Sequence, residues 1–238
     1  MDSILTAAQV AEKTTNVIPL GGLADFPLAF DCAEGVSSFS LEGKSFRTEN
    51  GVDPLFAPAI VQGDKLILMS LPYLLPYKTT DFLMVGSPQT QYIVIGKLND
   101  PFVEEFLNQT DELRVKLSAD IGLGGLDISK GDKIRLVDME GVISSNLPVP
   151  SVLQGLDDSV VSAVSFSLGN VWFYTKKGNN WQGESVPLIS MEDKRDAAKY
   201  GAIFSEDADR YWCGMQKAFK RINLLDDVYI SKGTEIEA

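Results

Sequence analysis

Short segments in which apolar and polar residues alternate recur between residues 36 and 188, and turn signals separate them. In the segment 112–119, for example, Leu113, Val115 and Leu117 alternate with polar or charged residues. A period of two is typical of a β-strand with one buried face. We therefore expect a mainly β or α+β fold whose body is a β-sandwich or is barrel-like.

The same signals locate other strands and one short helix. Segments 38–46, 60–71, 81–85, 91–97, 133–137 and 160–186 are expected to form strands, the last with a hairpin turn at 177–180. The segment 101–108 favours a helix instead, because Phe102, Phe106 and Leu107 cluster at helical spacing.

Two helices are expected near the C-terminus. Residues 190–193 fit a capping box that begins a short helix. A second helix is predicted over 206–222, because Trp212, Met215 and Phe219 recur every three or four residues. We expect these three side chains to dock onto the sheet, so that the two helices pack on one side of the body.

Changes in pattern along the chain suggest four segments. We expect an N-terminal arm over 1–35, a β-rich domain over 36–140 and a linker or loop over 141–158. A β-hairpin, the two helices and an acidic tail that starts at residue 223 would make up 159–238. The alternative is that 36–140 and 159–238 form one continuous domain.

The chain of 238 residues contains no histidine. Histidine is the only side chain whose unperturbed pKa lets it change charge near neutral pH, and it is the commonest metal ligand. Its absence excludes Ser-His and Cys-His nucleophile pairs and histidine-ligated zinc. Two cysteines are too few for a cysteine-only zinc site or an iron–sulfur cluster. We therefore expect a protein that is not an enzyme and has no catalytic residue, metal or cofactor.

Cys32 and Cys213 are far apart in the sequence, and we expect both to be free, buried thiols. The N-terminus begins Met-Asp-Ser and lacks the positive region of a signal peptide. The longest apolar stretch, 66–75, contains Pro72 and is too short to span a membrane. These features predict a cytoplasmic or virion protein that does not act at a membrane.

The formal net charge of −12 comes from 33 acidic and 21 basic residues. A field of that sign repels nucleic-acid phosphates and anionic membranes, and it favours solubility. The scarcity of catalytic residue types and the many short strands favour a structural or assembly protein, a component of a phage or viral particle. Its expected partners are other protein subunits in a homo- or hetero-oligomer.

An aromatic–lysine hairpin is the first candidate binding surface. In a strand, Trp172, Tyr174 and Lys176 share one face, and the following turn brings Lys177 and Trp181 alongside. Exposed aromatic side chains beside lysines can stack on bases or sugars. The alternative is that the aromatic side chains belong to the core and that the lysines lie at a solvated tip.

A second candidate is the basic end of the last helix, formed by Lys217, Lys220 and Arg221. These residues would form a positive patch if they met Lys130, Lys133 and Arg135 in space. The alternative is that they only complement the helix dipole.

Two other functions remain open from the sequence. Single-stranded nucleic-acid binding is suggested by the aromatic–lysine hairpin and opposed by the net charge. An enzyme that uses carboxylates and a metal ion is suggested by neighbouring acids such as Asp157-Asp158 and Glu206-Asp207, although pairs of this kind arise by chance in an acidic chain.

Overall fold

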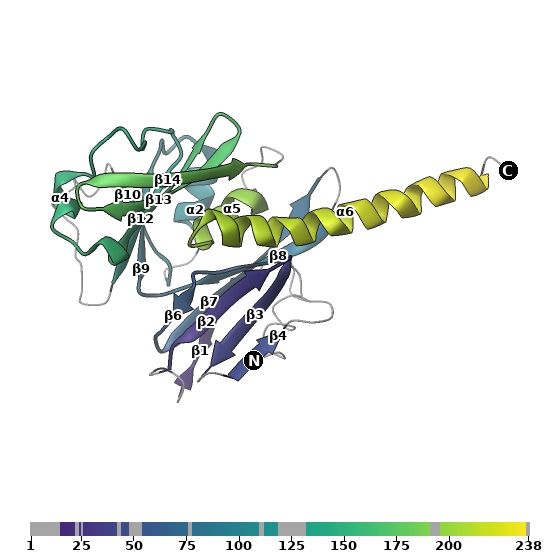
Figure 1. Cartoon of the computed structure of the whole chain (residues 1–238), viewed down its shortest axis with the longest axis horizontal. Coiled ribbons are helices and arrows are strands. Elements are labelled where there is room, and N and C mark those ends of the chain that lie inside the picture. Colours follow the sequence, from purple (N-terminus) through teal and green to yellow (C-terminus); the bar gives the residue numbers. More distant parts are fainter. Residues whose placement is uncertain are drawn as a thin grey trace.

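The computed structural model describes residues 15–21, 24, 26–41, 44–47, 54–75, 78–109, 112–118, 132–190 and 196–236. Their strands form three sheets, and two of their helices lie near the C-terminus, which confirms the mainly β or α+β prediction. The layers follow one another as sheet, sheet, helices and sheet, and the last helix projects from the body (Figure 1).

Two four-stranded sheets pack face to face as a sandwich. In the outer sheet the order is β4 (Lys44–Arg47), β3 (Val36–Leu41), β2 (Leu28–Ala33) and β6 (Ile60–Val61). In the inner sheet the order is β1 (Thr15–Pro19), β7 (Lys65–Leu74), β8 (Lys78–Gly86) and β5 (Leu55–Phe56). Phe30 and Phe39 of the outer sheet meet Leu66, Leu68 and Leu83 of the inner sheet in one buried cluster. The expected sandwich is therefore present.

Strand β7 is buried on both faces, which explains the apolar stretch 66–75. Leu66 and Leu68 face the outer sheet, whereas Ile67 and Met69 face the helices. A strand covered on both sides is nearly continuously apolar. Pro72 lies within this strand, opposite Asp81 of β8.

The third sheet has six strands and is partly parallel. Its order is β10 (Arg114–Leu117), β9 (Thr90–Ile95), β11 (Lys133–Asp138), β12 (Val161–Ser167), β13 (Asn170–Lys177) and β14 (Asn180–Pro187). The first four strands are parallel, and the last two are antiparallel and form the expected hairpin. The short elements α2 (Pro101–Leu107), α4 (Ser151–Gln154) and η2 (Asp158–Val160) lie in its connections.

Helices α5 (Ala197–Phe204) and α6 (Ala208–Ile236) fill the space between the inner sheet and the third sheet. Met215 is fully buried there, and Trp212 and Phe219 pack against the same cluster, as expected. The N-cap of α5 is Asp196, whose carboxylate accepts from two backbone N–H groups. The predicted capping box lies mostly outside the described residues.

Three sequence-based boundaries differ from the structure. Residues from 223 to 236 continue α6, so the prediction of a tail that begins at residue 223 is wrong; no proline interrupts the helix there. Two strands, β1 and β2, lie within the expected arm and pair in the sandwich. The expected linker 141–158 connects β11 and β12, which are neighbours in one sheet.

The prediction of free thiols is also wrong, because Cys32 and Cys213 form a disulfide bond. The bond joins β2 of the outer sheet to α6 across 181 residues of sequence. Packing of α6 against β2 brings the two side chains together, and sequence spacing carries no information about that contact.

The disulfide is expected to stabilise the fold strongly. Because it closes a loop of 181 residues, the chain-entropy description assigns it about 5 kcal/mol. Reduction should therefore lower the denaturation midpoint of the wild-type protein. The double variant Cys32→Ala/Cys213→Ala should start from the lower midpoint and be insensitive to reductant. Equal midpoints for oxidised and reduced wild type would contradict this expectation.

A glycine in α6 permits close contact with the core. A Cβ atom at Gly214 would lie 2.7 Å from Cε1 of Phe56, whose side chain is buried. Alanine would add about 1 kcal/mol of helix propensity, but overpacking costs about 1–3 kcal/mol. We expect Gly214→Ala to lower the unfolding free energy measured in urea. The control Gly155→Ala meets nothing within 4 Å and should cause no loss.

Candidate interaction surface

The C-terminal half of α6 extends beyond the body. The helix starts where the carboxylate of Asp207 accepts from the N–H of Arg210, and its first half buries Tyr211, Met215 and Ala218. Beyond Ile222, all side chains that the structure describes are exposed. Figure 1 shows this part as a yellow helix that projects away from the sheets. We call residues 223–236 the overhang.

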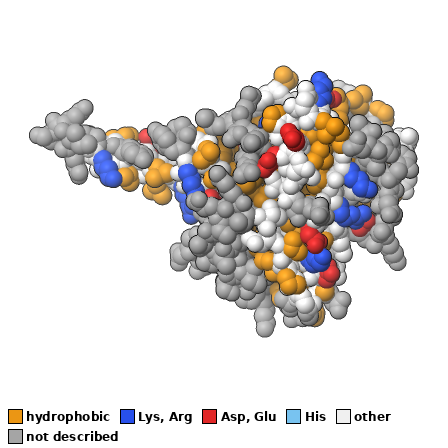
Figure 2. All heavy atoms as spheres, turned by 180° about the vertical axis from the view of Figure 1, so that it is seen from behind, with side chains coloured by type: hydrophobic (Ala, Val, Ile, Leu, Met, Phe, Trp, Pro, Cys, Tyr) orange, Lys and Arg blue, Asp and Glu red, His pale blue; other side chains and the backbone are white. Residues whose placement is uncertain are grey.

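Large apolar side chains lie on the overhang. Leu224 is 64% exposed, Leu225 40%, Val228 49% and Ile230 59%. Hydrophobic side chains on the projecting rod stand beside charged ones in Figure 2. At 1.5 Å per residue the overhang is about 20 Å long, and an isolated helix of that size is marginal in water. Partner contacts would stabilise such a helix.

Charges along α6 change sign where the overhang begins. Lys217, Lys220 and Arg221 lie on the last packed turns, whereas Asp226 and Asp227 lie on the overhang. The ammonium of Lys220 donates to the carbonyl of Glu34 at 2.9 Å, and Arg221 donates to the hydroxyl of Thr80. These basic residues therefore anchor the helix to the β2–β3 turn and to β8.

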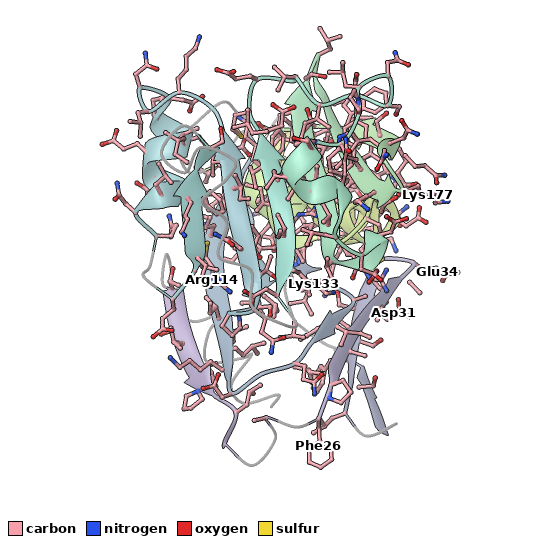
Figure 3. The ribbon with its side chains drawn as sticks, turned by 90° about the vertical axis from the view of Figure 1, so that its left-hand side faces the viewer. Phe26, Asp31, Glu34, Arg114, Lys133 and Lys177 are labelled. Atoms are coloured by element: carbon pink, nitrogen blue, oxygen red, sulfur yellow. A yellow bond between two sulfur atoms is a disulfide. The ribbon has the colours of Figure 1, made fainter. Side chains whose placement is uncertain are left out.

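The second candidate cluster is not brought together as one patch. Arg135 lies on β11 of the third sheet, and its partners include backbone carbonyls at and just after the end of α5. Lys133 lies at the start of the same strand (Figure 3), and Lys130 is outside the described residues. The partners of Lys220 and Arg221, in contrast, are in the outer and inner sheets.

In the aromatic–lysine hairpin, Trp172, Tyr174 and Lys176 share one face, as predicted. Tyr174 and Trp181 are buried in the cluster behind the third sheet, with ring centroids 6.3 Å apart. Trp172 is partly buried, and Lys177 is exposed. The aromatic side chains therefore serve largely as core, which leaves Trp172 and Lys177 as the accessible members of the predicted binding set.

Lys176 does not lie at a solvated tip, because its side chain is only 2% exposed. The ammonium donates to the carbonyl of Leu156 at 2.8 Å and to a carboxylate oxygen of Asp158 at 2.5 Å. A buried charge needs such partners to offset its desolvation. Lys176 therefore joins the hairpin to the turn that contains η2.

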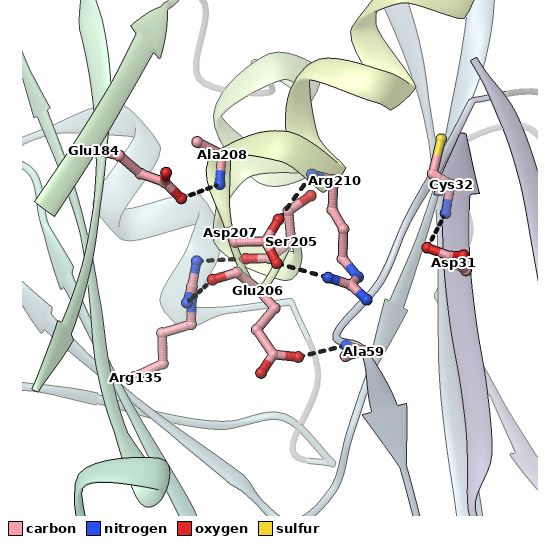
Figure 4. Close-up of polar contacts among 10 residues, drawn as sticks. All are labelled: Asp31, Cys32, Ala59, Arg135, Glu184, Ser205, Glu206, Asp207, Ala208 and Arg210. Atoms are coloured by element: carbon pink, nitrogen blue, oxygen red, sulfur yellow. Dashed lines mark hydrogen bonds and ion pairs between the residues drawn. The ribbon is translucent and has the colours of Figure 1, made fainter. Parts of the chain in front are cut away.

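Arg135 is the most deeply buried of the described cations in the predicted patch. Its guanidinium donates to the carbonyls of Ser205 and Glu206, just after the end of α5 (Figure 4). It also donates to the carbonyl of Ala202 in the last turn of that helix. A positive charge at a helix C-terminus is favourable. Burial nevertheless lowers the pKa of Arg135 to about 10.

The exposed apolar side chains of the overhang were missed by the sequence prediction. Leu224, Leu225, Val228 and Ile230 lie in a stretch that was expected to be a polar tail. Their apolar character within a continuing helical segment was the available signal. A test of periodicity beyond residue 222 would have found it.

Within the part of the chain that the structure describes, no group of three or more acidic or cysteine side chains is placed to hold a metal ion. No described helix is long and apolar enough to cross a membrane. Comparison with protein-family models, curated proteins and solved structures finds no match to this chain.

Acid should weaken the link between the hairpin and the η2 turn. Hydrogen bonds from Lys176 and from the N–H of Gly178 lower the pKa of Asp158 below the usual aspartate range. A lowered carboxyl pKa stabilises the fold above about pH 4, and that contribution is lost as the pH falls through the folded-state value. We expect Asp158→Asn to lower the unfolding free energy at pH 7, with a smaller difference from wild type near pH 3.

Denaturant unfolding at a series of pH values measures this difference. Asp64→Asn removes an exposed carboxylate between β6 and β7, outside the η2 turn and the overhang, and is the matched control. A destabilisation by Asp158→Asn that is independent of pH would show that the charge of Asp158 is not responsible.

Proposed function

We propose that the protein is a structural subunit that assembles with a second copy of itself through the overhang of α6. The supporting observation is the projection of a helix whose large apolar side chains face solvent while its first half is fixed in the core. Apolar patches on a soluble protein are typical of interaction sites.

The apolar side chains supply the driving force for association. Burial of a leucine or valine side chain is worth about 1.5–3 kcal/mol relative to exposure. Leu224 and Val228 are one helical turn apart, so a partner helix can cover both. Covering the pair would stabilise an otherwise marginal helical segment.

The charge pattern favours a second copy of the chain as the partner. Basic residues 217–221 precede the acidic pair Asp226 and Asp227 on the same helix. If two α6 helices lie antiparallel, the acidic pair of each faces the basic turns of the other, and twofold symmetry makes this contact twice. Opposite charges of this kind fix register and orientation.

The net charge of −12 opposes self-association at long range. At physiological ionic strength the Debye length is about 8 Å, so charges on distant parts of two copies are largely screened. Contacts along the paired helices, and not the overall net charge, then determine whether two copies associate. Membership in a phage or viral particle and the absence of catalysis stay predictions, as does single-stranded nucleic-acid binding.

The experiment is a measurement of molar mass by light scattering and sedimentation over a range of concentrations. The wild-type protein should be a dimer or a larger assembly. The double variant Leu224→Asp/Val228→Asp should shift the dissociation constant upwards by about a hundredfold or more, because two buried side chains are lost.

The matched control is Leu168→Asp. Leu168 is 98% exposed in the β12–β13 turn, away from α6, so its replacement should leave the molar mass unchanged. Equal denaturation midpoints would show that the body remains folded in every variant. A wild-type protein that is monomeric at all concentrations, or an unaffected double variant, would overturn the proposal and leave a different partner for the overhang.

A further inference from the structure

A cavity of about 190 Å³ lies where the third sheet meets the α5–α6 junction. Residues of β9 and β11 at the amino ends of these strands form one wall, with the start of β12 beside them. Ser205 and Glu206, in the turn between the two helices, form the opposite wall. Figure 4 shows the polar contacts of this turn.

Two deeply buried polar side chains that line the cavity have unpartnered atoms. Arg135 is 6% exposed and Ser205 is 1% exposed. Within the described part of the chain, neither the Nε of Arg135 nor the Oγ of Ser205 has a hydrogen-bond partner. Buried polar groups without partners are rare and costly. A ligand with acceptor atoms would satisfy the N–H of Arg135 and the hydroxyl of Ser205.

Lys133 adds a cation to the same wall. It precedes Arg135 by two residues on β11, so the two side chains leave the strand on the same face. Among the described residues, the ammonium of Lys133 has no hydrogen-bond or ion-pair partner. Three groups that can donate hydrogen bonds therefore border the cavity, and two of them carry positive charge.

The acidic side chains that border the cavity already have partners. Glu206 accepts from the N–H of Ala59 at 2.6 Å, and Asp158 accepts from Lys176 and from the N–H of Gly178. The unused groups are therefore mainly donors, which suits an anion. The two carboxylates would repel a dianion more than a monoanion, so a single negative charge is favoured.

The remaining lining mixes apolar side chains with hydroxyl side chains, from Thr90, Ser159, Ser162 and Thr175. Tyr92, Val161, Ile203 and Phe204 border the cavity together with Pro58. The volume exceeds that of the engineered cavity of roughly 150 Å³ that binds benzene. A ligand with a flat or short apolar body and one anionic group fits both the size and the lining.

We propose that this cavity binds a small monocarboxylate whose anionic group contacts Lys133, Arg135 and Ser205 and whose apolar body lies against Tyr92 and Phe204. The site is independent of the proposed assembly, because the overhang does not contribute to its lining. Because the cavity lies at the α5–α6 junction, a bound ligand would contact the end of α5 and the turn that leads into α6.

The test is titration calorimetry of the full chain with benzoate, benzamide and inorganic phosphate. Benzoate should bind saturably, whereas benzamide, which has the same shape but no charge, should bind at least about tenfold more weakly. Tighter binding of benzamide or phosphate than of benzoate would overturn the monocarboxylate assignment. The absence of saturable benzoate binding would overturn the site.

Variants then locate the site without disturbing the fold. Lys133→Gln should weaken benzoate binding by about tenfold, and Lys116→Gln, at an exposed position on β10 of the same sheet, should not change it. Ser205→Ala removes an unpartnered hydroxyl, so it should weaken benzoate binding while the denaturation midpoint is unchanged or raised. Equal effects of Lys133→Gln and Lys116→Gln would overturn the proposal.

Discussion

The guanidinium of Arg135 holds together the junction on which the layers of the fold depend. It donates hydrogen bonds to carbonyls at the end of α5. Around the same turn, the carboxylates of two glutamates accept from backbone N–H groups (Figure 4). Glu206 accepts from the N–H of Ala59 in the sandwich, and Glu184 of β14 accepts from the N–H of Ala208 at the start of α6. One short turn therefore adds polar links from both helices to the sandwich and to the third sheet, beside the core packing and the disulfide that also hold them.

Local patterns in the sequence predicted the elements that depend on local chemistry. Alternation over 112–119 identified β10, turn residues identified the hairpin between β13 and β14, and helical spacing identified the packed half of α6. The parallel order of β9, β11 and β12 was not predictable in this way. Helical spacing did predict α2, but α4, which lies between β11 and β12, has only four residues and is too short to carry a period, and register between strands is a tertiary property.

Predictions that required knowledge of distant neighbours failed or stayed open. The pairing of Cys32 with Cys213 depends on how α6 crosses β2, and the burial of Lys176 depends on a carboxylate 18 residues earlier. The prediction of free thiols followed from the expected intracellular location, whereas disulfides persist mainly in oxidising environments. The cavity at Arg135 was equally hidden, since its lining comes from segments that are far apart in the sequence.

The disulfide also determines how the protein would respond to mechanical load. The projecting rod of α6 begins after Ile222, and Cys213 lies less than three helical turns before it. A pull on the rod along its axis would reach this covalent bond before it reached the start of the helix, and the bond would pass the force to β2. Traction would then be carried by the hydrogen-bonded strands of the sandwich, and the α5–α6 junction would be shielded from it.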